Sequence, residues 1–165
     1  MSRLVRLFFL TLTTFIACAH ARRGGERASD FTLPELSGRS WNLSSAAGKV
    51  VVLDFWATWC GPCKKELPVL AALARRYGAK GKDVLFVAIS IDKDRERAAE
   101  FVNEAKLDSL IVLHDPEGAV AARYDLPTMP TSYVIDRQGV VRHVHAGFEA
   151  GDEDALAAEI DGLLK

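Results

Sequence analysis

The chain has 165 residues, of which 49% are hydrophobic and 26% are charged, so it is long enough for one compact domain with a hydrophobic core. Its formal net charge is -1, with 21 lysines and arginines against 22 acidic residues, and no long block of one sign interrupts this balance. This charge pattern argues against a nucleic-acid partner and against binding of acidic lipid through a basic surface.

The first 21 residues have the pattern of a signal peptide. Two arginines precede a short apolar run, residues 7–17, and small residues follow it. The run is shorter than the roughly 20 apolar residues that a membrane-spanning helix needs, although an uncleaved anchor is the alternative. We expect cleavage after Ala19 or Ala21, which predicts an exported protein whose signal occupies residues 1–21.

Cys18 offers a second way to process this segment. Residues 15–18, Phe-Ile-Ala-Cys, resemble a bacterial lipobox, although such motifs usually carry leucine where Phe15 stands. In that case residues 1–17 are a lipoprotein signal, and Cys18 is the lipidated first residue of a membrane-anchored protein. Otherwise Cys18 is a small residue of the discarded peptide.

The folded domain is expected over residues 29–165, after a polar, flexible linker at residues 22–28. Apolar and polar residues alternate on both sides of Ser37-Gly38-Arg39, which predicts an amino-terminal hairpin. The run at residues 50–56 is almost continuously apolar and rich in β-branched residues. Such a run is typical of a strand that is buried on both faces.

A helix is predicted over residues 60–77, where apolar residues recur every three or four positions, with Gly78 past its end and Pro68 kinking its interior. A second buried strand at residues 84–91 completes a unit of two parallel strands joined by a helix. The later predicted elements are a helix at 93–106, a strand at 110–113, a helix at 117–124, strands at 132–135 and 140–145, and a helix at 152–164. This order predicts an α/β fold with a central mixed sheet flanked by helices.

Cys60 and Cys63 are the only cysteines beyond the signal segment, so the mature domain can form one internal disulfide. In an oxidising compartment, so close a pair is expected to be redox-active, because closing a small loop constrains the unfolded chain little. The pair opens the predicted helix, where unpaired N–H groups and partial positive charge stabilise a thiolate. We therefore predict that Cys60 attacks a substrate and that Cys63 resolves the mixed disulfide.

Cys-x-x-Cys is also half of many zinc sites, but the chain has no second cysteine pair to complete one. His143 and His145 are the candidates for completing it, and we expect them to be surface residues on one face of a strand. We therefore predict no metal and no other cofactor.

Residues 51–68, Val-Val-Leu-Asp-Phe-Trp-Ala-Thr-Trp-Cys-Gly-Pro-Cys-Lys-Lys-Glu-Leu-Pro, resemble the thioredoxin superfamily and, within it, the exported TlpA/ResA-like group. The Cys-Lys-Lys-Glu-Leu-Pro continuation, the amino-terminal hairpin and the helix-strand segment at 93–113 are typical of that group. The likeness covers residues 29–165 and implies a thioredoxin-like fold and thiol-disulfide exchange.

The same resemblance implies a substrate-binding surface. It places residues 129–131 in a cis-proline loop that faces the cysteine pair and holds the substrate backbone. It also implies that Trp59 forms an apolar contact surface for partner proteins. The predicted substrate-binding residues are Trp59, Gly61, Pro62, Met129, Pro130 and Thr131.

Two acids are candidate catalytic residues for proton transfer. Asp54 interrupts the buried run and matches the buried aspartate of thioredoxin, and its burial is expected to raise its pKa so that it can accept the Cys63 proton. Glu66 matches the acidic residue of the ResA-like group, or else it is a solvated acid that favours the helix dipole. ResA-like proteins commonly carry an uncharged residue at the position of Asp54, so which acid dominates stays open; we favour Asp54.

Gly-Pro between the cysteines is the pairing of reducing thioredoxins, whose potential lies about 150 mV, or about 7 kcal/mol for two electrons, below that of DsbA. The Gly-Pro pairing therefore favours a reductase. We expect it to be a monomer and its substrates to be cysteine-containing proteins. The resemblance implies apocytochrome c as a substrate and a membrane thiol protein as the electron donor.

One rival is a peroxiredoxin-like peroxidase, but Ala57 stands where those enzymes have threonine. The other is a copper-binding chaperone of this fold, whose cysteines are usually separated by three residues.

Overall fold

The computed structural model describes residues 25–165. The predicted signal peptide at residues 1–21 and the candidate lipidation site Cys18 lie outside the described residues. Within residues 25–165, none of the helices has the length and the apolar character that crossing a membrane requires.

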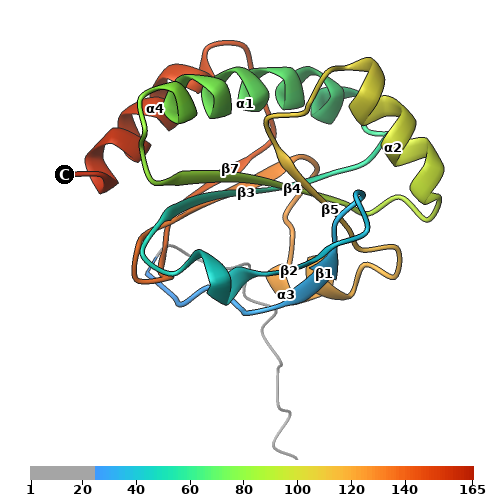
Figure 1. The fold of residues 1–165 in the computed structure, drawn as a ribbon, viewed down its shortest axis with the longest axis horizontal. Helices are drawn as coiled ribbons and strands as arrows, with labels where there is room; N and C mark the ends of the chain where they lie inside the picture. Colours follow the sequence, from blue (N-terminus) through green and yellow to red (C-terminus); the bar gives the residue numbers. More distant parts are fainter. Residues whose placement is uncertain (1–24) are drawn as a thin grey trace, which may run out of the picture.

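A five-stranded mixed sheet with the strand order β5-β4-β3-β6-β7 forms the centre of the fold (Figure 1). Its strands are β3 (Val50–Trp56), β4 (Val84–Ser90), β5 (Ile111–His114), β6 (Thr131–Ile135) and β7 (Val141–Ala146). The first three are parallel, β6 is antiparallel to β3, and β7 is antiparallel to β6. The partly parallel sheet that the sequence predicts is therefore confirmed.

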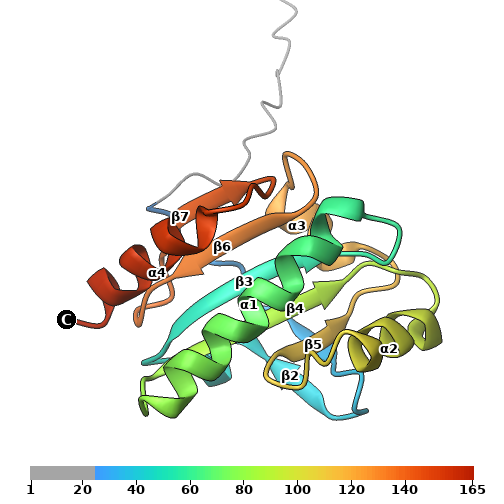
Figure 2. The same cartoon turned by 90° about the horizontal axis from the view of Figure 1, so that it is seen from above.

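Helices and a small hairpin cover the two faces of this sheet (Figures 1 and 2). On one face lie α1 (Gly61–Ala79), α2 (Arg95–Glu104) and α4 (Asp152–Leu163). On the other lie α3 (Ala119–Tyr124), the hairpin of β1 (Thr32–Pro34) and β2 (Ser40–Asn42), and the short 3-10 helix η1 (Leu43–Ala46). The hairpin is confirmed, whereas η1 was not predicted.

All seven residues of β3 are buried, because both faces of the strand are covered. Successive side chains point to opposite faces, so Val52 and Trp56 belong to the core under α1, while Leu53 and Phe55 belong to the core above the hairpin. Asp54 has the same parity as Val52 and Trp56, so this alternation directs its carboxyl toward α1.

Helix α1 ends later than the sequence predicts. Pro68 lies in its interior as expected, but Gly78 lies inside the helix, which continues to Ala79. The stop comes at Gly81, which adopts a left-handed backbone with φ of 60° and donates its N–H to the Gly78 carbonyl at 3.0 Å. Assigning the stop to Gly78 was therefore wrong, because the glycine that reverses the chain is three residues further on.

Two other helices begin later than predicted because aspartates cap them. The Asp94 carboxylate accepts hydrogen bonds from two N–H groups of the first turn of α2, so the helix starts after Asp94 and not at residue 93. Asp115 accepts three N–H groups at 2.9–3.0 Å at the start of α3, which begins at Ala119 and not at residue 117.

Residues 25–28 belong to the segment that the sequence analysis assigns to a linker. In the structure, the Gly25 N–H donates to the Val141 carbonyl and the Ala28 N–H donates to the Gly139 carbonyl at 2.9 Å. These residues therefore pack along the β6–β7 turn, ahead of the predicted start of the domain.

Candidate active site

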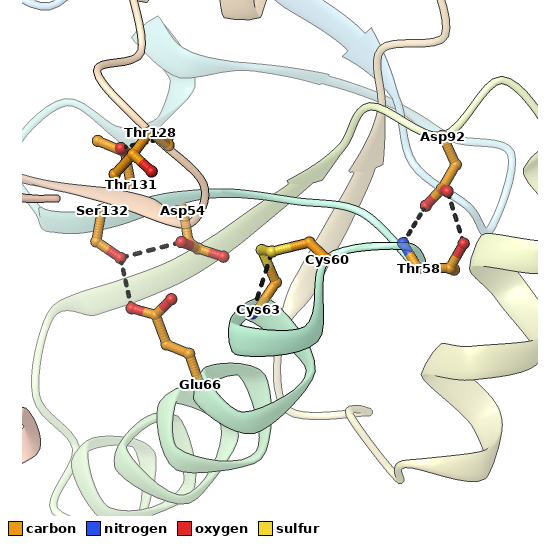
Figure 3. The surroundings of a disulfide bond; sticks show 9 residues. All are labelled: Asp54, Thr58, Cys60, Cys63, Glu66, Asp92, Thr128, Thr131 and Ser132. Atoms are coloured by element: carbon orange, nitrogen blue, oxygen red, sulfur yellow. Dashed lines mark hydrogen bonds between the residues drawn. A yellow bond between two sulfur atoms is a disulfide. The ribbon is translucent and has the colours of Figure 1, made fainter. Parts of the chain in front are cut away.

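A disulfide joins Cys60 and Cys63 where β3 ends and α1 begins, with 5.3 Å between their Cα atoms (Figure 3). Cys60 is the N-cap residue of α1, and its Sγ accepts the Cys63 N–H at 3.2 Å. The sulfur of Cys60 thus takes the place of a capping oxygen at the positive end of a helix, which favours a thiolate once the disulfide is reduced. Cys60 keeps 6% of its surface exposed and Cys63 none, so a partner reaches the pair at Cys60.

The loop before Cys60 is held by the buried carboxylate of Asp92, two residues after the end of β4. Asp92 accepts the Thr58 N–H at 2.9 Å, the Thr58 hydroxyl at 2.7 Å and the Ser90 hydroxyl at 3.0 Å. Beside this fixed loop, the Trp59 side chain is 66% exposed. This exposure leaves Trp59 accessible to a partner, and its contact role remains a prediction.

Two buried carboxyls lie behind the disulfide, joined by the hydroxyl of Ser132 (Figure 3). The Ser132 Oγ lies 3.1 Å from Asp54 Oδ1 and 3.1 Å from Glu66 Oε1. Among the described residues, the second oxygen of each carboxyl is buried without a hydrogen-bond partner. In Figure 3 the Asp54 carboxyl points toward the disulfide.

Burial sets the protonation of these acids. It raises the pKa of Asp54 to about 7, although hydrogen bonds from Ser132 and the Phe55 backbone act in the opposite direction. Burial, followed by the neighbouring Asp54 charge, raises the pKa of Glu66 to about 9. Glu66 is 5% exposed, so its alternative interpretation as a solvated acid is wrong. The raised pKa of Asp54 agrees with the sequence expectation.

The predicted substrate-binding loop also lies at this end of the sheet. The Met129–Pro130 peptide bond is cis, as the resemblance implies, and the Pro130 carbonyl accepts the Gly147 N–H at 2.9 Å. Thr131 is fully buried, and its hydroxyl donates to the Thr128 carbonyl. This side chain therefore serves the loop itself.

A groove of about 630 Å³ runs beside the loop, lined by Pro62, Thr128, Met129, residues 144–149 and Asp152. The structure thus brings Pro62 and Met129, which are far apart in the sequence, to one surface. Trp59, Gly61, Pro130 and Thr131 do not line this groove. The substrate-binding roles of all six residues remain predictions.

Sequence reasoning missed two polar residues of this site, Ser132 and Asp92. Each carried a weak signal, because Ser132 directly follows the predicted cis-proline loop and Asp92 directly follows a predicted buried strand. Both are at least 95% buried. Asp54 and Glu66, which contact Ser132, and Thr58, which contacts Asp92, are far from them in the sequence, so the local pattern alone does not identify these contacts.

The two histidines that were considered for a zinc site face α4. His143 Nδ1 lies 3.2 Å from Glu159 Oε1, and His145 Nε2 lies 2.7 Å from Glu159 Oε2. Within residues 25–165, no group of three or more His, Cys, Asp or Glu side chains is arranged to hold a metal ion.

Comparisons with known proteins agree with this arrangement. The family model described as Redoxin matches residues 23–160. The chain is 37% identical over 137 residues to the thioredoxin-like protein YneN of Bacillus subtilis, covering 83% of this chain and 79% of that protein. It is 31% identical over 144 residues to the thiol-disulfide oxidoreductase ResA of Geobacillus kaustophilus, covering 87% and 81%.

Among solved structures, a candidate thiol:disulfide interchange protein DsbE from Chlorobium tepidum matches with a TM-score of 0.80 at 37% identity, over 87% of this chain and 99% of that chain. The fold is therefore thioredoxin-like, and it contains the Cys60–Cys63 disulfide. The chain belongs to the Redoxin family of the thioredoxin superfamily and is a thiol-disulfide oxidoreductase of the TlpA/ResA-like group.

Proposed function

We propose that this protein is an exported reductase of protein disulfides. The reduced Cys60 thiolate attacks a substrate disulfide, and the first substrate sulfur leaves as a thiolate. Cys63 then attacks Cys60, so that the Cys60–Cys63 bond forms while the bond from Cys60 to the substrate breaks. The substrate gains two electrons from the cysteine pair, together with the proton of the Cys63 thiol and one proton from solvent, because Cys60 attacks as a thiolate.

The observation that carries this proposal is the position of Cys60 as the cap of α1, with the Cys63 N–H directed at its sulfur. A thiolate at this position is stabilised by the helix and is a good nucleophile near neutral pH. The Gly61-Pro62 pairing, which reducing thioredoxins share, supports the reductive direction.

Asp54 is the proposed proton acceptor for Cys63. Its pKa of about 7 lets it take the thiol proton and release it again at neutral pH, which is the property of an efficient general base. Trp59, Gly61, Pro62 and the loop at residues 129–131 are proposed to bind the substrate around the cysteine pair.

The finer parts of the proposal concern location and partners. We infer a signal at residues 1–21 and a thioredoxin-like domain that includes the packed residues 25–28 ahead of residue 29, with lipidation at Cys18 as the alternative processing. Apocytochrome c is the proposed client, and a membrane thiol protein is the proposed donor. Incorporation of a labelled fatty acid that Cys18→Ser abolishes would support the lipid anchor, and absence of label would exclude it.

The direction is tested by the reduction potential of the Cys60–Cys63 couple, measured by equilibration with glutathione or dithiothreitol. A value near that of thioredoxin, about -270 mV, is expected, whereas a value near that of DsbA, about -120 mV, would overturn the reductase assignment. Absence of peroxide consumption is also expected, since Ala57 replaces the threonine of peroxidases.

The client is tested by trapping. In Cys63→Ser the mixed disulfide on Cys60 cannot be resolved, so substrates stay attached and can be identified by mass spectrometry. The matched control is the double variant Cys60→Ser with Cys63→Ser, which should trap nothing. A failure of Cys63→Ser to accumulate mixed disulfides, together with no reduction of a generic disulfide protein, would refute the proposed activity.

A further inference from the structure

The side chain of Ser132 lies between two buried acids that come from different elements. Asp54 on β3 and Ser132 on β6 are direct cross-strand partners, and Glu66 reaches the same point from α1. The serine hydroxyl is within 3.1 Å of one oxygen of each carboxyl. All three residues are at least 95% buried, so bulk water does not compete for these contacts.

The hydrogen-bonding capacity of serine limits how these contacts can be satisfied. A hydroxyl carries one hydrogen to donate, while an ionised carboxylate can only accept. If both acids were ionised, Ser132 could donate to one, and its oxygen would face the lone pairs of the other. If one acid is protonated, it donates to Ser132 Oγ while Ser132 donates to the other acid. Both contacts are then hydrogen bonds.

We propose that Ser132 is a positioning residue that joins Asp54 and Glu66 into one acid-base pair, which holds a single shared proton in the oxidised protein. The inference rests on the proposed role of Asp54 as the proton acceptor for Cys63. In this arrangement, Ser132 Oγ accepts the proton of one acid while it gives its own proton to the other, so the resident proton changes sides without any movement of the backbone. Each acid then depends on the protonation of its partner.

With one shared proton, the pair takes up one proton and releases one proton in each turnover. Before resolution the pair holds one proton; it takes a second when Asp54 accepts the proton of Cys63. The Cys63 thiolate then attacks Cys60, and the pair returns one proton to the departing substrate thiolate or to solvent. Glu66 therefore keeps Asp54 ionised at the start of each cycle by carrying the resident proton itself.

The surroundings provide a short route for that proton. A cavity of about 10 Å³, close to the volume that one water requires, is lined by Glu66 and Ser132, by His145 on β7, and by Asp152 and Glu153 on α4. Besides Glu66, these three outer residues are the titratable groups among the described residues that line this cavity, while Cys63, on the side of Asp54, is held in the disulfide. Asp152 adds to the rise in the pKa of Glu66.

The first test uses the unaltered oxidised protein. The side-chain carboxyl carbons of Asp54 and Glu66 are followed by ¹³C NMR from pH 4 to pH 10. A shared proton predicts that both resonances titrate with the same two apparent pKa values and that the pair holds at least one proton at pH 7. Independent single-step titrations, or two ionised acids at pH 7, would overturn the inference.

The second test compares Ser132→Ala with Ser109→Ala, which removes a hydroxyl that bonds the Ala71 carbonyl away from the disulfide. Stopped-flow fluorescence follows the resolution of a Cys60 mixed disulfide with a labelled peptide. Loss of the Ser132 donor should raise the pKa of Asp54 by about 1, so resolution slows roughly 5-fold at pH 7 and recovers by pH 9. Ser109→Ala should match the wild type.

The outcomes distinguish a failure of the shared proton from a failure of the proposed role of Asp54 as the proton acceptor for Cys63. A Ser132→Ala profile that coincides with the wild type, or one lowered equally at every pH, would refute the shared proton. If Asp54→Asn also leaves resolution unchanged, the proposed role of Asp54 fails as well. Recovery in Ser132→Thr, which keeps the hydroxyl, is expected because the bridge and not the shape of serine is required.

Discussion

Asp54→Asn should change how the stability of the oxidised protein depends on pH. The wild-type carboxyl is 1% exposed, and burial raises its pKa from 3.8 to about 7. At low pH the acid is protonated in both the folded and the unfolded chain. As pH rises from about 4, the unfolded chain ionises first, so stability is progressively lost up to about pH 7 and stays low above it.

The size of this effect follows from the change in pKa. A pKa raised by about 3 corresponds to about 4 kcal/mol of unfolding free energy, which is lost between pH 4 and pH 8. Asparagine does not titrate, so the variant avoids this loss. Its amide nitrogen, however, would take the place of an oxygen that has no partner in the described structure, at a cost of about 1–3 kcal/mol. The variant should be less stable than the wild type near pH 4 and about 1–3 kcal/mol more stable at pH 8.

Urea unfolding of the oxidised proteins, followed by circular dichroism at pH 4, 6 and 8, checks this crossover. Asp108→Asn, a change at an exposed position, is the matched control and should follow the wild type at each pH. Asp54→Asn also removes the charge that raises the pKa of Glu66, so the comparison reports on Asp54 together with its effect on Glu66. A stability difference that stays constant from pH 4 to pH 8 would contradict the reasoning, because it would mean that Asp54 ionises alike in the folded and unfolded chains.

Three further changes probe the loop before the disulfide, the start of α3 and the exposed Trp59. Asp92→Ala removes the acceptor of the Thr58 N–H and hydroxyl, so it should cost about 2–3 kcal/mol in urea unfolding and abolish the hydrogen-exchange protection of the Thr58 amide; retained protection would contradict this. Asp115→Ala removes the acceptor of three N–H groups of α3 and should cost about 2 kcal/mol, whereas a loss below about 0.5 kcal/mol would show that water replaces it. Trp59→Ala should change stability by less than about 0.5 kcal/mol but raise the KM for a protein disulfide, and an unchanged KM would remove Trp59 from the binding surface.

The parts of the fold that depend on local patterns were predictable from the sequence. The apolar run of β3 and the cysteine pair at the start of α1 each lie within a few neighbouring residues, so their patterns are complete in the sequence. The cis bond before Pro130 was expected only from the family resemblance. Helix ends were less predictable, since both Gly78 and Gly81 could end α1 and only the structure shows that Gly81 has the left-handed backbone. The length of a helix depends on contacts that its sequence does not contain.

The polar contacts of the site were predictable only in part. Asp54 and Glu66 were identified one at a time, from burial and from family resemblance. Ser132 was missed, because its contact with Asp54 spans 78 positions and arises from the antiparallel register of β3 and β6. Asp92 was missed for the same reason, since Thr58 lies 34 positions away on the other side of α1.

The alternation of β3 explains why an acid is retained in so apolar a strand. Val52, Asp54 and Trp56 share the face toward α1, and that face also contacts Cys63 and Leu67. Moving the carboxyl one position along the strand, to residue 53 or 55, would turn it toward the core above the hairpin, away from the disulfide. Residue 54 therefore combines burial with direction toward the α1 face, and the same burial that lowers stability above pH 7 keeps the acid near the pKa that proton exchange with Cys63 requires.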